Sequence, residues 1–310
     1  MPFTPYGSNP FLPAAEDGMW NWIDRLGLAE DAARRQRLRH ARAGLMAALV
    51  SPTCDAERLT WLACWTAFGF LVDDEFDDGP LGRDLARCQS LIGELTSVLD
   101  GRPDSQPADG GALRRAMDDL WQRIVPGRSL GWIRSARMNA GAWLSTYSAE
   151  TADRVADRLP GVAEYRLHRR DSVAGLLYMD LVEAMIEIDL PETVRQLPQW
   201  QALRAFAADH VGLCNDIYSA RKESDAGYGH NMVALIRADQ NCDIRSAAHR
   251  ANAMATGYMR EFLDAETQLL AGTGLPPDTR VDAAHCARAY RAIIRGNFDY
   301  HLAAPRYRDR

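Results

Sequence analysis

Apolar residues recur three and four positions apart along almost the whole chain, and almost no segment alternates between apolar and polar residues as a β-strand does. This spacing predicts an all-α fold of about ten helices. Short stretches rich in glycine and proline, such as Gly79-Pro80, Pro126-Gly127 and residues 272–277, indicate where helices end. The expected helices are 15–25, 29–49, 55–76, 83–99, 111–124, 128–151, 160–186, 192–223, 231–271 and 277–299.

The 310 residues are enough for two domains of ordinary size, but no stretch of distinct composition divides the chain into two parts. The polar loop at 101–111 is short and lies between two expected helices. We therefore expect residues 1–310 to form a single α-helical domain. Within it, residues 1–14 are expected to be an irregular N-terminal segment and residues 300–310 a C-terminal tail.

The chain carries 36 Lys and Arg residues against 42 Asp and Glu, a formal net charge of −6. This balance argues against general nucleic-acid binding, because neutralising many phosphates requires a basic face. The charge balance does not exclude an anionic ligand in a local pocket. The N-terminal residues do not look like a signal peptide, no apolar run reaches the ~18 residues of a membrane span, and the six cysteines form no CxxC pair. We expect a cytoplasmic protein with free thiols and no membrane insertion.

An acidic cluster directly follows the apolar segment Trp61–Val72, and it reads Asp73-Asp74-Glu75-Phe76-Asp77-Asp78. On a helix Asp73 and Asp77 share a face, whereas Asp74 is turned away by about 100°. Carboxylates at a helix C-terminus are unfavourable unless a cation is bound, and Mg²⁺ takes carboxylate oxygens together with substrate phosphates and water. The alternative is an acidic helix end that leads into an exposed turn.

A second set of oxygen-bearing side chains lies on the helix expected at 192–223. Asn215, Ser219 and Glu223 are spaced four residues apart, so an amide, a hydroxyl and a carboxylate form one stripe. All three are ligands that a hard divalent cation accepts. Alternatively, Asn215 and Ser219 simply face solvent. The pattern N-D-I-x-S-x-x-x-E would arise by chance on the order of once in a thousand chains of this length.

Together the two stretches resemble the motifs of class I terpene synthases, in particular the compact bacterial enzymes with one α domain. Residues 73–77 look like the aspartate-rich DDxxD motif and residues 215–223 like the NSE motif, with a typical separation of 215 − 73 = 142 positions. The resemblance implies an antiparallel helical bundle around a central apolar cavity. It also implies three Mg²⁺ ions bound with a substrate diphosphate, two by Asp73 with help from Asp77 and one by Asn215, Ser219 and Glu223.

The family also has an arginine that senses the diphosphate, 46 positions before the NSE asparagine. That distance leads to Arg169, whereas Arg170 beside it is the weaker choice. Arginine suits this role because its planar fork pairs with two phosphate oxygens. Without the resemblance, both would be taken as exposed arginines. The same alignment makes Ser172 the linker and Val173 the effector, whose carbonyl lies in a helix break and faces the substrate cation.

Three further residues are implied to contact the diphosphate. Arg306 and Tyr307 look like the family's C-terminal RY pair, and Lys222 lies inside the NSE stretch. Without the resemblance, the polar tail from Pro305 would be read as a disordered end.

The wall of a cavity that holds a carbocation must be apolar and unreactive, with aromatic faces that stabilise the cation. Four residues on the face of Asp73 are candidates for this wall: Trp65, Thr66, Gly69 and Phe70. Leu62 shares that face, and the apolar stretch at 176–178 is a further candidate. Most aromatic residues at helical spacing are merely core. Tyr300 stands where many family members have Trp, and its hydroxyl could form a hydrogen bond or transfer a proton.

The resemblance implies a Mg²⁺-dependent terpene cyclase that ionises a linear prenyl diphosphate and releases diphosphate. Farnesyl diphosphate is the first expectation for the substrate and geranylgeranyl diphosphate the second, and the family allows a homodimer. One alternative is a chain-elongating prenyltransferase, which would carry a second aspartate-rich motif at residues 215–223. The other is a non-catalytic helical interaction module, in which both motifs and the RY pair would be accidental.

Overall fold

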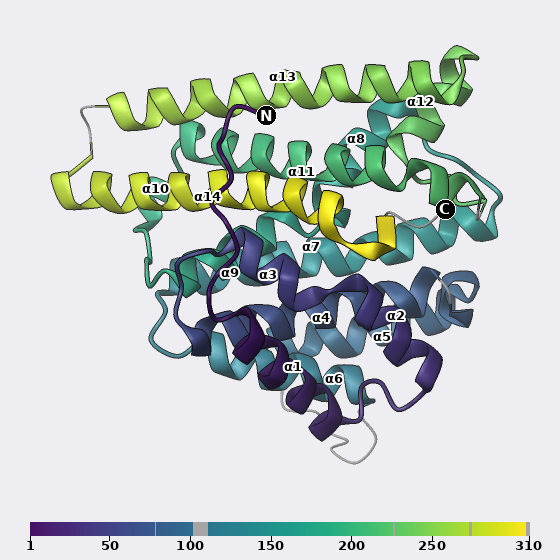
Figure 1. Cartoon of the computed structure of the whole chain (residues 1–310), viewed down its shortest axis with the longest axis horizontal. Helices are drawn as coiled ribbons and strands as arrows, with labels where there is room; N and C mark the ends of the chain where they lie inside the picture. The colour runs from purple at the N-terminus through teal and green to yellow at the C-terminus, as the bar shows by residue number, and fades with distance from the viewer. Residues whose placement is uncertain (78, 102–110, 226, 273–274, 308–310) are drawn as a thin grey trace.

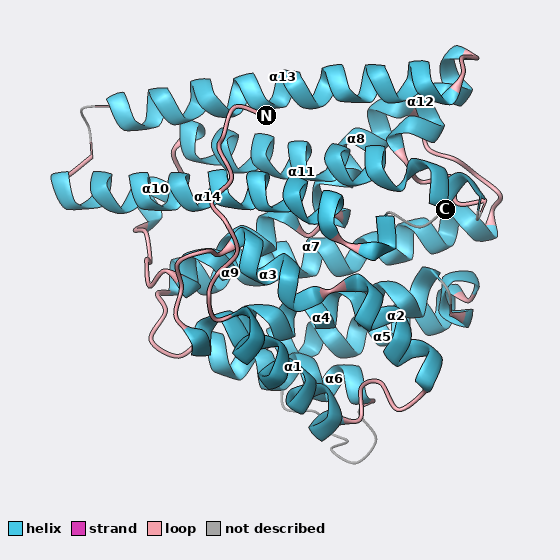
Figure 2. Ribbon diagram, in the orientation of Figure 1, coloured by secondary structure: helices cyan, strands magenta, loops and turns pink. Residues whose placement is uncertain are grey.

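The computed structural model describes residues 1–77, 79–101, 111–225, 227–272 and 275–307. These residues form α-helices and two short 3₁₀ helices, with no strand among them (Figure 2), which confirms the all-α prediction. The α-helices are α1 Leu12–Leu26, α2 Ala32–Ala41, α3 Ala43–Val50, α4 Ala56–Asp77, α5 Leu85–Leu99, α6 Ala112–Ile124, α7 Leu130–Val155, α8 Val162–Ser172, α9 Gly175–Met185, α10 Glu192–Arg195, α11 Pro198–Asp225, α12 Met232–Gln240, α13 Ile244–Ala271 and α14 Pro277–Ala303. The 3₁₀ helices are η1 Pro80–Arg83 and η2 Pro305–Tyr307.

Four of the expected helices are each divided in two, so that α2 and α3, α8 and α9, α10 and α11, and α12 and α13 are separate. Three of the breaks contain a non-glycine residue with positive φ: Arg42 at 51°, Ala174 at 54° and Asn241 at 45°. A Cβ atom disfavours this conformation at Arg42 and Ala174, where the surrounding packing must impose it, whereas asparagine adopts it readily at the end of a helix. The pattern of apolar residues continues across these points, so helical periodicity alone does not predict most of the breaks.

The ends of the chain are more helical than expected. Helix α1 begins at Leu12, inside the segment expected to be irregular. Helix α14 continues to Ala303, so Tyr300 lies in a helix instead of a tail.

Two helices that carry the sequence motifs, α4 and α11, lie inside the bundle. Helix α11 contacts α8, α9, α12, α13 and α14, while α4 contacts α1, α3, α6 and α9 (Figure 1). Helix α9 therefore packs against both of them, and α13 covers α11 from the outside. One large cluster of buried apolar residues fills most of the bundle, and a smaller one lies around α12. In the described residues we find no helix with the apolar length needed to cross a bilayer.

Helix α14 lies directly on the C-terminal end of α3. A Cβ atom at Gly296 would be 2.3 Å from the carbonyl oxygen of Leu49 and 2.8 Å from the nitrogen of Val50. Both of these are backbone atoms, which cannot move aside as a flexible side chain can. The absence of a side chain at Gly296 thus sets the distance between α3 and α14, and with it the position of Tyr300 one turn later.

We predict that Gly296→Ala lowers the free energy of unfolding by about 2 kcal/mol or more, because the added methyl group overpacks a rigid contact. Gly93→Ala is the matched control, since Gly93 is exposed on α5 and has open space around it. Alanine there should stabilise the helix by about 0.5–1 kcal/mol. Urea unfolding measures both changes, and equal effects of the two substitutions would contradict the close contact.

Candidate active site

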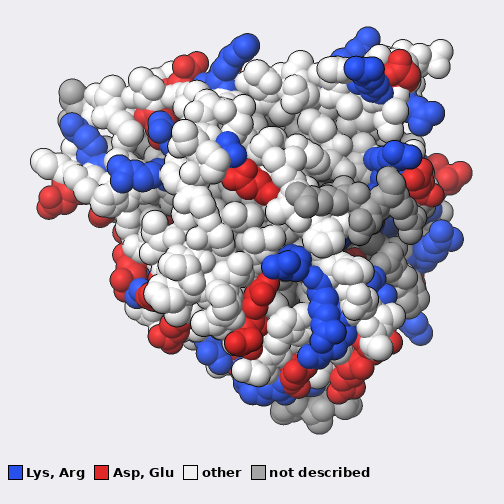
Figure 3. Space-filling model, in the orientation of Figure 1, with Lys and Arg blue, Asp and Glu red and all other residues white. Residues whose placement is uncertain are grey.

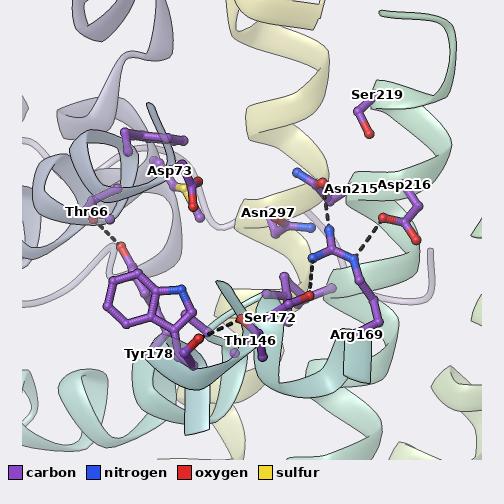
Figure 4. A pocket seen from close by; sticks show the side chains of 18 of the residues that line it. Thr66, Asp73, Thr146, Arg169, Ser172, Tyr178, Asn215, Asp216, Ser219 and Asn297 are labelled. Carbon is purple, nitrogen blue, oxygen red and sulfur yellow. Dashed lines mark hydrogen bonds and ion pairs between the residues drawn. The ribbon is translucent and has the colours of Figure 1, made fainter. Parts of the chain in front are cut away.

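A pocket between α4, α7, α8, α9, α11 and α14 brings together the residues singled out in the sequence (Figure 4). Those that line it are Trp65, Thr66, Gly69, Phe70, Asp73, Arg169, Ser172, Val173, Asn215, Ser219, Lys222, Glu223, Tyr300 and Arg306. The side chains of Asp77 and Tyr307 lie outside the described residues. Leu177 and Tyr178 also line the pocket, whereas Leu62 is fully buried in the core beside it.

The acids of the 73–78 cluster have different surroundings. Asp73 lines the pocket and accepts a hydrogen bond from the hydroxyl of Tyr147. Asp74 pairs with Arg37 at 3.1 Å and Glu75 with Arg34 at 2.6 Å, both on α2. Figure 3 shows acidic and basic side chains side by side on the surface around α1 and α2. Asp74 and Glu75 are therefore half-buried and held by arginines of α2, whereas Asp73 lines the pocket.

Burial raises the pKa of the Asp73 carboxyl, although the hydrogen bond from Tyr147 and the positive charge of Arg306 act to lower it. The ring of Tyr147 stacks on Phe76 with a centroid distance of 4.3 Å, which holds its hydroxyl toward the pocket. Asp73 is thus a carboxylate in a partly apolar setting that a cation would stabilise.

Asn215, Ser219 and Glu223, which we call the α11 stripe, line the pocket from the side opposite Asp73 (Figure 4). Ser219 is buried, so the alternative that it faces solvent is wrong. Burial and the nearby Asp216 carboxylate raise the pKa of Glu223, against the effect of hydrogen bonds from Asn231 and Ser219. The pocket therefore has, on two facing walls, oxygen atoms that could bind a cation.

Arg169 connects α8 to α11 through three hydrogen bonds. Its Nε donates to Oδ1 of Asp216 at 2.8 Å, its Nη2 to Oδ1 of Asn215 at 2.8 Å, and its Nη1 to Oγ of Ser172 at 3.1 Å. It crosses α11 at Gly212, where a Cβ atom would be 3.1 Å from Cγ of Arg169. The neighbouring Arg170 donates two hydrogen bonds to Asp209 instead, at 2.8 and 2.7 Å. Of this arginine pair, Arg169 is the one that lines the pocket.

Asp216 is a member of this network that the sequence did not single out. Its carboxylate also accepts hydrogen bonds from the backbone nitrogen of Met232 at 2.9 Å and the hydroxyl of Tyr165 at 3.4 Å. Burial raises its pKa, while Arg169 acts to lower it. A buried aspartate on an inner helix needs such a cationic partner. The sequence signal for Asp216 is its place beside Asn215 on a helix that is otherwise largely apolar at this point.

The break between α8 and α9 forms part of the pocket wall. Helix α8 ends at Ser172, Ala174 has a φ of 54°, and α9 begins at Gly175. Gly175 is required there because a Cβ atom would lie 2.9 Å from Cβ of Ala208 on α11. Among the described residues, no backbone N–H donates to the carbonyl of Val173. The C-terminus of α8, with its partial negative charge, therefore ends at the pocket.

His301 is another residue that the sequence did not indicate. Its Nε2 lies 3.2 Å from Nδ2 of Asn215 and its Nδ1 lies 2.7 Å from the carbonyl oxygen of Asn297. An amide nitrogen donates and a carbonyl accepts, so the ring is neutral with its proton on Nδ1. Burial lowers the pKa of His301 to about 4. This contact keeps Oδ1 of Asn215 turned toward Arg169.

The deeper wall of the pocket is aromatic, and its hydroxyl groups are bonded to one another. Trp65, Phe70 and Trp143 line it together with Tyr178. The Tyr178 hydroxyl lies 2.5 Å from Oγ1 of Thr66, which donates to the carbonyl oxygen of Leu62 at 2.7 Å. Since these polar groups are already hydrogen-bonded, this wall presents chiefly aromatic and apolar surface.

Tyr300 contributes its ring to the wall but directs its hydroxyl elsewhere. The ring lies 6.5 Å from that of Phe70, and the guanidinium of Arg306 lies 5.3 Å from the Phe70 ring on the pocket side. The hydroxyl donates to the carbonyl oxygen of Ala41, the last residue of α2. Of the two roles considered for this hydroxyl, the structure shows a hydrogen bond that joins α14 to α2.

We predict that Tyr300→Phe lowers the free energy of unfolding by about 1–3 kcal/mol, because it leaves the buried Ala41 carbonyl without this donor. Tyr218→Phe is the control, since the hydroxyl of Tyr218 makes no hydrogen bond within the described part of the chain and its ring stacking on His301 is kept. That change should stay within about 0.5 kcal/mol. Thermal or urea unfolding would refute the assignment if both variants behaved alike.

Comparisons with known proteins identify the family of the chain and its fold. Residues 64–261 match the family model described as terpene synthase family 2, C-terminal metal binding. The (2Z,6E)-hedycaryol synthase of Kitasatospora setae is 32% identical over 310 residues, which cover 99% of this chain and 90% of that protein. The (+)-T-muurolol synthase ((2E,6E)-farnesyl diphosphate cyclizing) of Roseiflexus castenholzii is 31% identical, with 78% of this chain and 74% of that protein covered. A solved structure of hedycaryol synthase in complex with HEPES superimposes with a TM-score of 0.86 at 32% identity, covering 98% of this chain and 97% of the other.

Proposed function

The chain belongs to terpene synthase family 2 and is a class I terpene synthase, and on this premise we propose that it cyclises farnesyl diphosphate to a sesquiterpene with release of diphosphate. The observation that carries the proposal is the pocket itself. In one part of the pocket, oxygen atoms that could bind a cation face each other, and an aromatic wall lines the other part of the pocket. Farnesyl diphosphate is favoured because the names of three relatives specify it. Geranylgeranyl diphosphate remains the second choice.

The side chains of the pocket fit a hard divalent cation, which agrees with the metal binding described for the family. The α11 stripe supplies amide, hydroxyl and carboxylate oxygens, and Asp73 lies opposite. In the described part of the chain, no three His, Cys, Asp or Glu side chains are grouped closely enough to hold an ion by themselves. This suits Mg²⁺, which commonly completes its coordination with substrate phosphates and water.

We assign three Mg²⁺ ions to this site, two held by Asp73 with help from Asp77 and one by the α11 stripe. Bound with the diphosphate, they would neutralise the leaving group so that the allylic C–O bond can ionise.

The diphosphate itself would be bound by cationic side chains around the same part of the pocket. Arg169, Lys222 and Arg306 are assigned to it, with Tyr307 completing the C-terminal pair. Arg169 already has Asp216 as a counter-ion at its Nε, so Nη2 is the part of its fork that can exchange Asn215 for a phosphate oxygen. The hydrogen bond between Arg169 and Ser172 transmits such a movement to the helix break.

The hydrocarbon chain would lie against the aromatic wall. The carbonyl of Val173 and the partial negative charge at the end of α8 are assigned to stabilise the positive charge on the chain. The faces of Trp65, Phe70 and Tyr300 add cation–π attraction and exclude water. Thr66 and Gly69 shape the wall between them, and a Cβ atom at Gly69 would meet nothing within 4 Å. The residues that line the pocket come from helices along most of the chain. We therefore propose that residues 1–310 form one catalytic domain.

We predict that purified protein converts farnesyl diphosphate to a cyclic sesquiterpene in the presence of Mg²⁺, and not after the metal is removed with EDTA. Gas chromatography with mass spectrometry detects the product, with geranyl and geranylgeranyl diphosphate tested in parallel. A diterpene from geranylgeranyl diphosphate as the main product would correct the substrate assignment. No terpene from any of the three substrates would contradict the proposed cyclase.

The two neighbouring acids Asp73 and Asp74 allow a matched test of the site. Asp73→Asn should lower kcat/KM at least about 100-fold, because it removes a charged ligand from the reacting centre. Asp74→Asn should change it less than about threefold, because Asp74 pairs with Arg37 outside the pocket. Helical circular dichroism should be unchanged in both variants. Comparable activity of the two would show that the assignment of Asp73 is wrong.

A further inference from the structure

Asn231 is fixed at the start of α12 by its own helix cap. Its Oδ1 accepts hydrogen bonds from the backbone nitrogens of Val233 at 2.8 Å and Ala234 at 3.4 Å. The residue is 1% exposed. Because Oδ1 is occupied by two N–H donors, the amide cannot be reversed, and Nδ2 must point the other way.

In that direction lies the C-terminal part of the α11 stripe. Nδ2 of Asn231 lies 2.8 Å from Oε2 of Glu223, 3.3 Å from Oγ of Ser219 and 2.9 Å from the carbonyl oxygen of Asp216. An amide nitrogen has two hydrogens, so it can satisfy two of these acceptors at a time. The two shortest contacts are those with Glu223 and with the Asp216 carbonyl, and Ser219 lies beside the same nitrogen.

We propose that Asn231 is a positioning residue that orients Glu223 for the metal ion of the α11 stripe. The inference rests on the proposed function, which makes Glu223 a metal ligand. By binding Oε2 of Glu223, Asn231 restrains the rotation of the carboxylate. Its amide is neutral, so it satisfies a buried carboxylate without cancelling the charge that would attract the cation. Such outer partners of metal ligands commonly change affinity or activity 10–100-fold when they are removed.

Asn231→Ser tests this positioning role while keeping the helix cap. Serine caps a helix about as well as asparagine, but it has no amide to donate to Glu223. Asp243→Ser is the matched control, because Asp243 caps α13 through the nitrogen of Ser246 and lies outside the pocket. The measurement is the increase in Tm as Mg²⁺ is titrated in the presence of inorganic diphosphate, with kcat/KM as a function of Mg²⁺ recorded alongside.

The proposal predicts that Asn231→Ser keeps the Tm of the ligand-free protein within a few degrees and raises the Mg²⁺ midpoint 10–100-fold. Asp243→Ser should leave that midpoint within twofold of the wild type. If Asn231→Ser fails to fold, Asn231→Thr takes its place, because threonine also caps a helix and has no amide to donate to Glu223. A wild-type midpoint in either folded variant overturns the role of Asn231. A wild-type protein that gains no Tm from Mg²⁺ and diphosphate overturns the proposed metal site as well.

Discussion

The buried ion pair between Arg169 and Asp216 is the interaction on which the arrangement of the site depends. A charge inside a helical bundle is tolerated only with a partner, so each residue fixes the other. Arg169 then extends to Ser172 at the helix break and to Asn215 on α11, while Asp216 accepts the backbone nitrogen of Met232 at the start of α12. One ion pair thus sets the relative positions of α8, α11 and α12.

The acids around the pocket differ in the kind of partner that holds them. Asp74 and Asp209 are paired with arginines, which serves the structure of the bundle. Asp73 and Glu223 accept hydrogen bonds from the neutral side chains of Tyr147 and Asn231. Neutral donors hold a carboxylate in place while leaving its charge available, so these two acids are suited to attract cations. The aromatic wall beyond them has no such charge, and the pocket is therefore divided into a polar and an apolar part.

Much of this could be predicted from the sequence, because helical geometry fixes which residues share a face. The α11 stripe and the wall next to Asp73 follow from a repeat of 3.6 residues. The choice of Arg169 came from the family resemblance, since periodicity does not distinguish it from Arg170. The positive φ of Ala174 could not be anticipated, because packing of α9 against α11 imposes it. Asn231 was also missed, since its role arises from a helix break and from contacts that only the folded chain brings together.

The account rests on the claim that Asp73 and the α11 stripe hold metal ions on a shared diphosphate. The most direct test is a crystal structure of the protein with Mn²⁺ and inorganic diphosphate, in which anomalous scattering locates each metal ion. We expect anomalous peaks within bonding distance of Asp73 and of Asn215, Ser219 and Glu223, with the diphosphate between them and in contact with Arg169. Peaks confined to other sites, or a diphosphate bound away from both walls, would contradict the account.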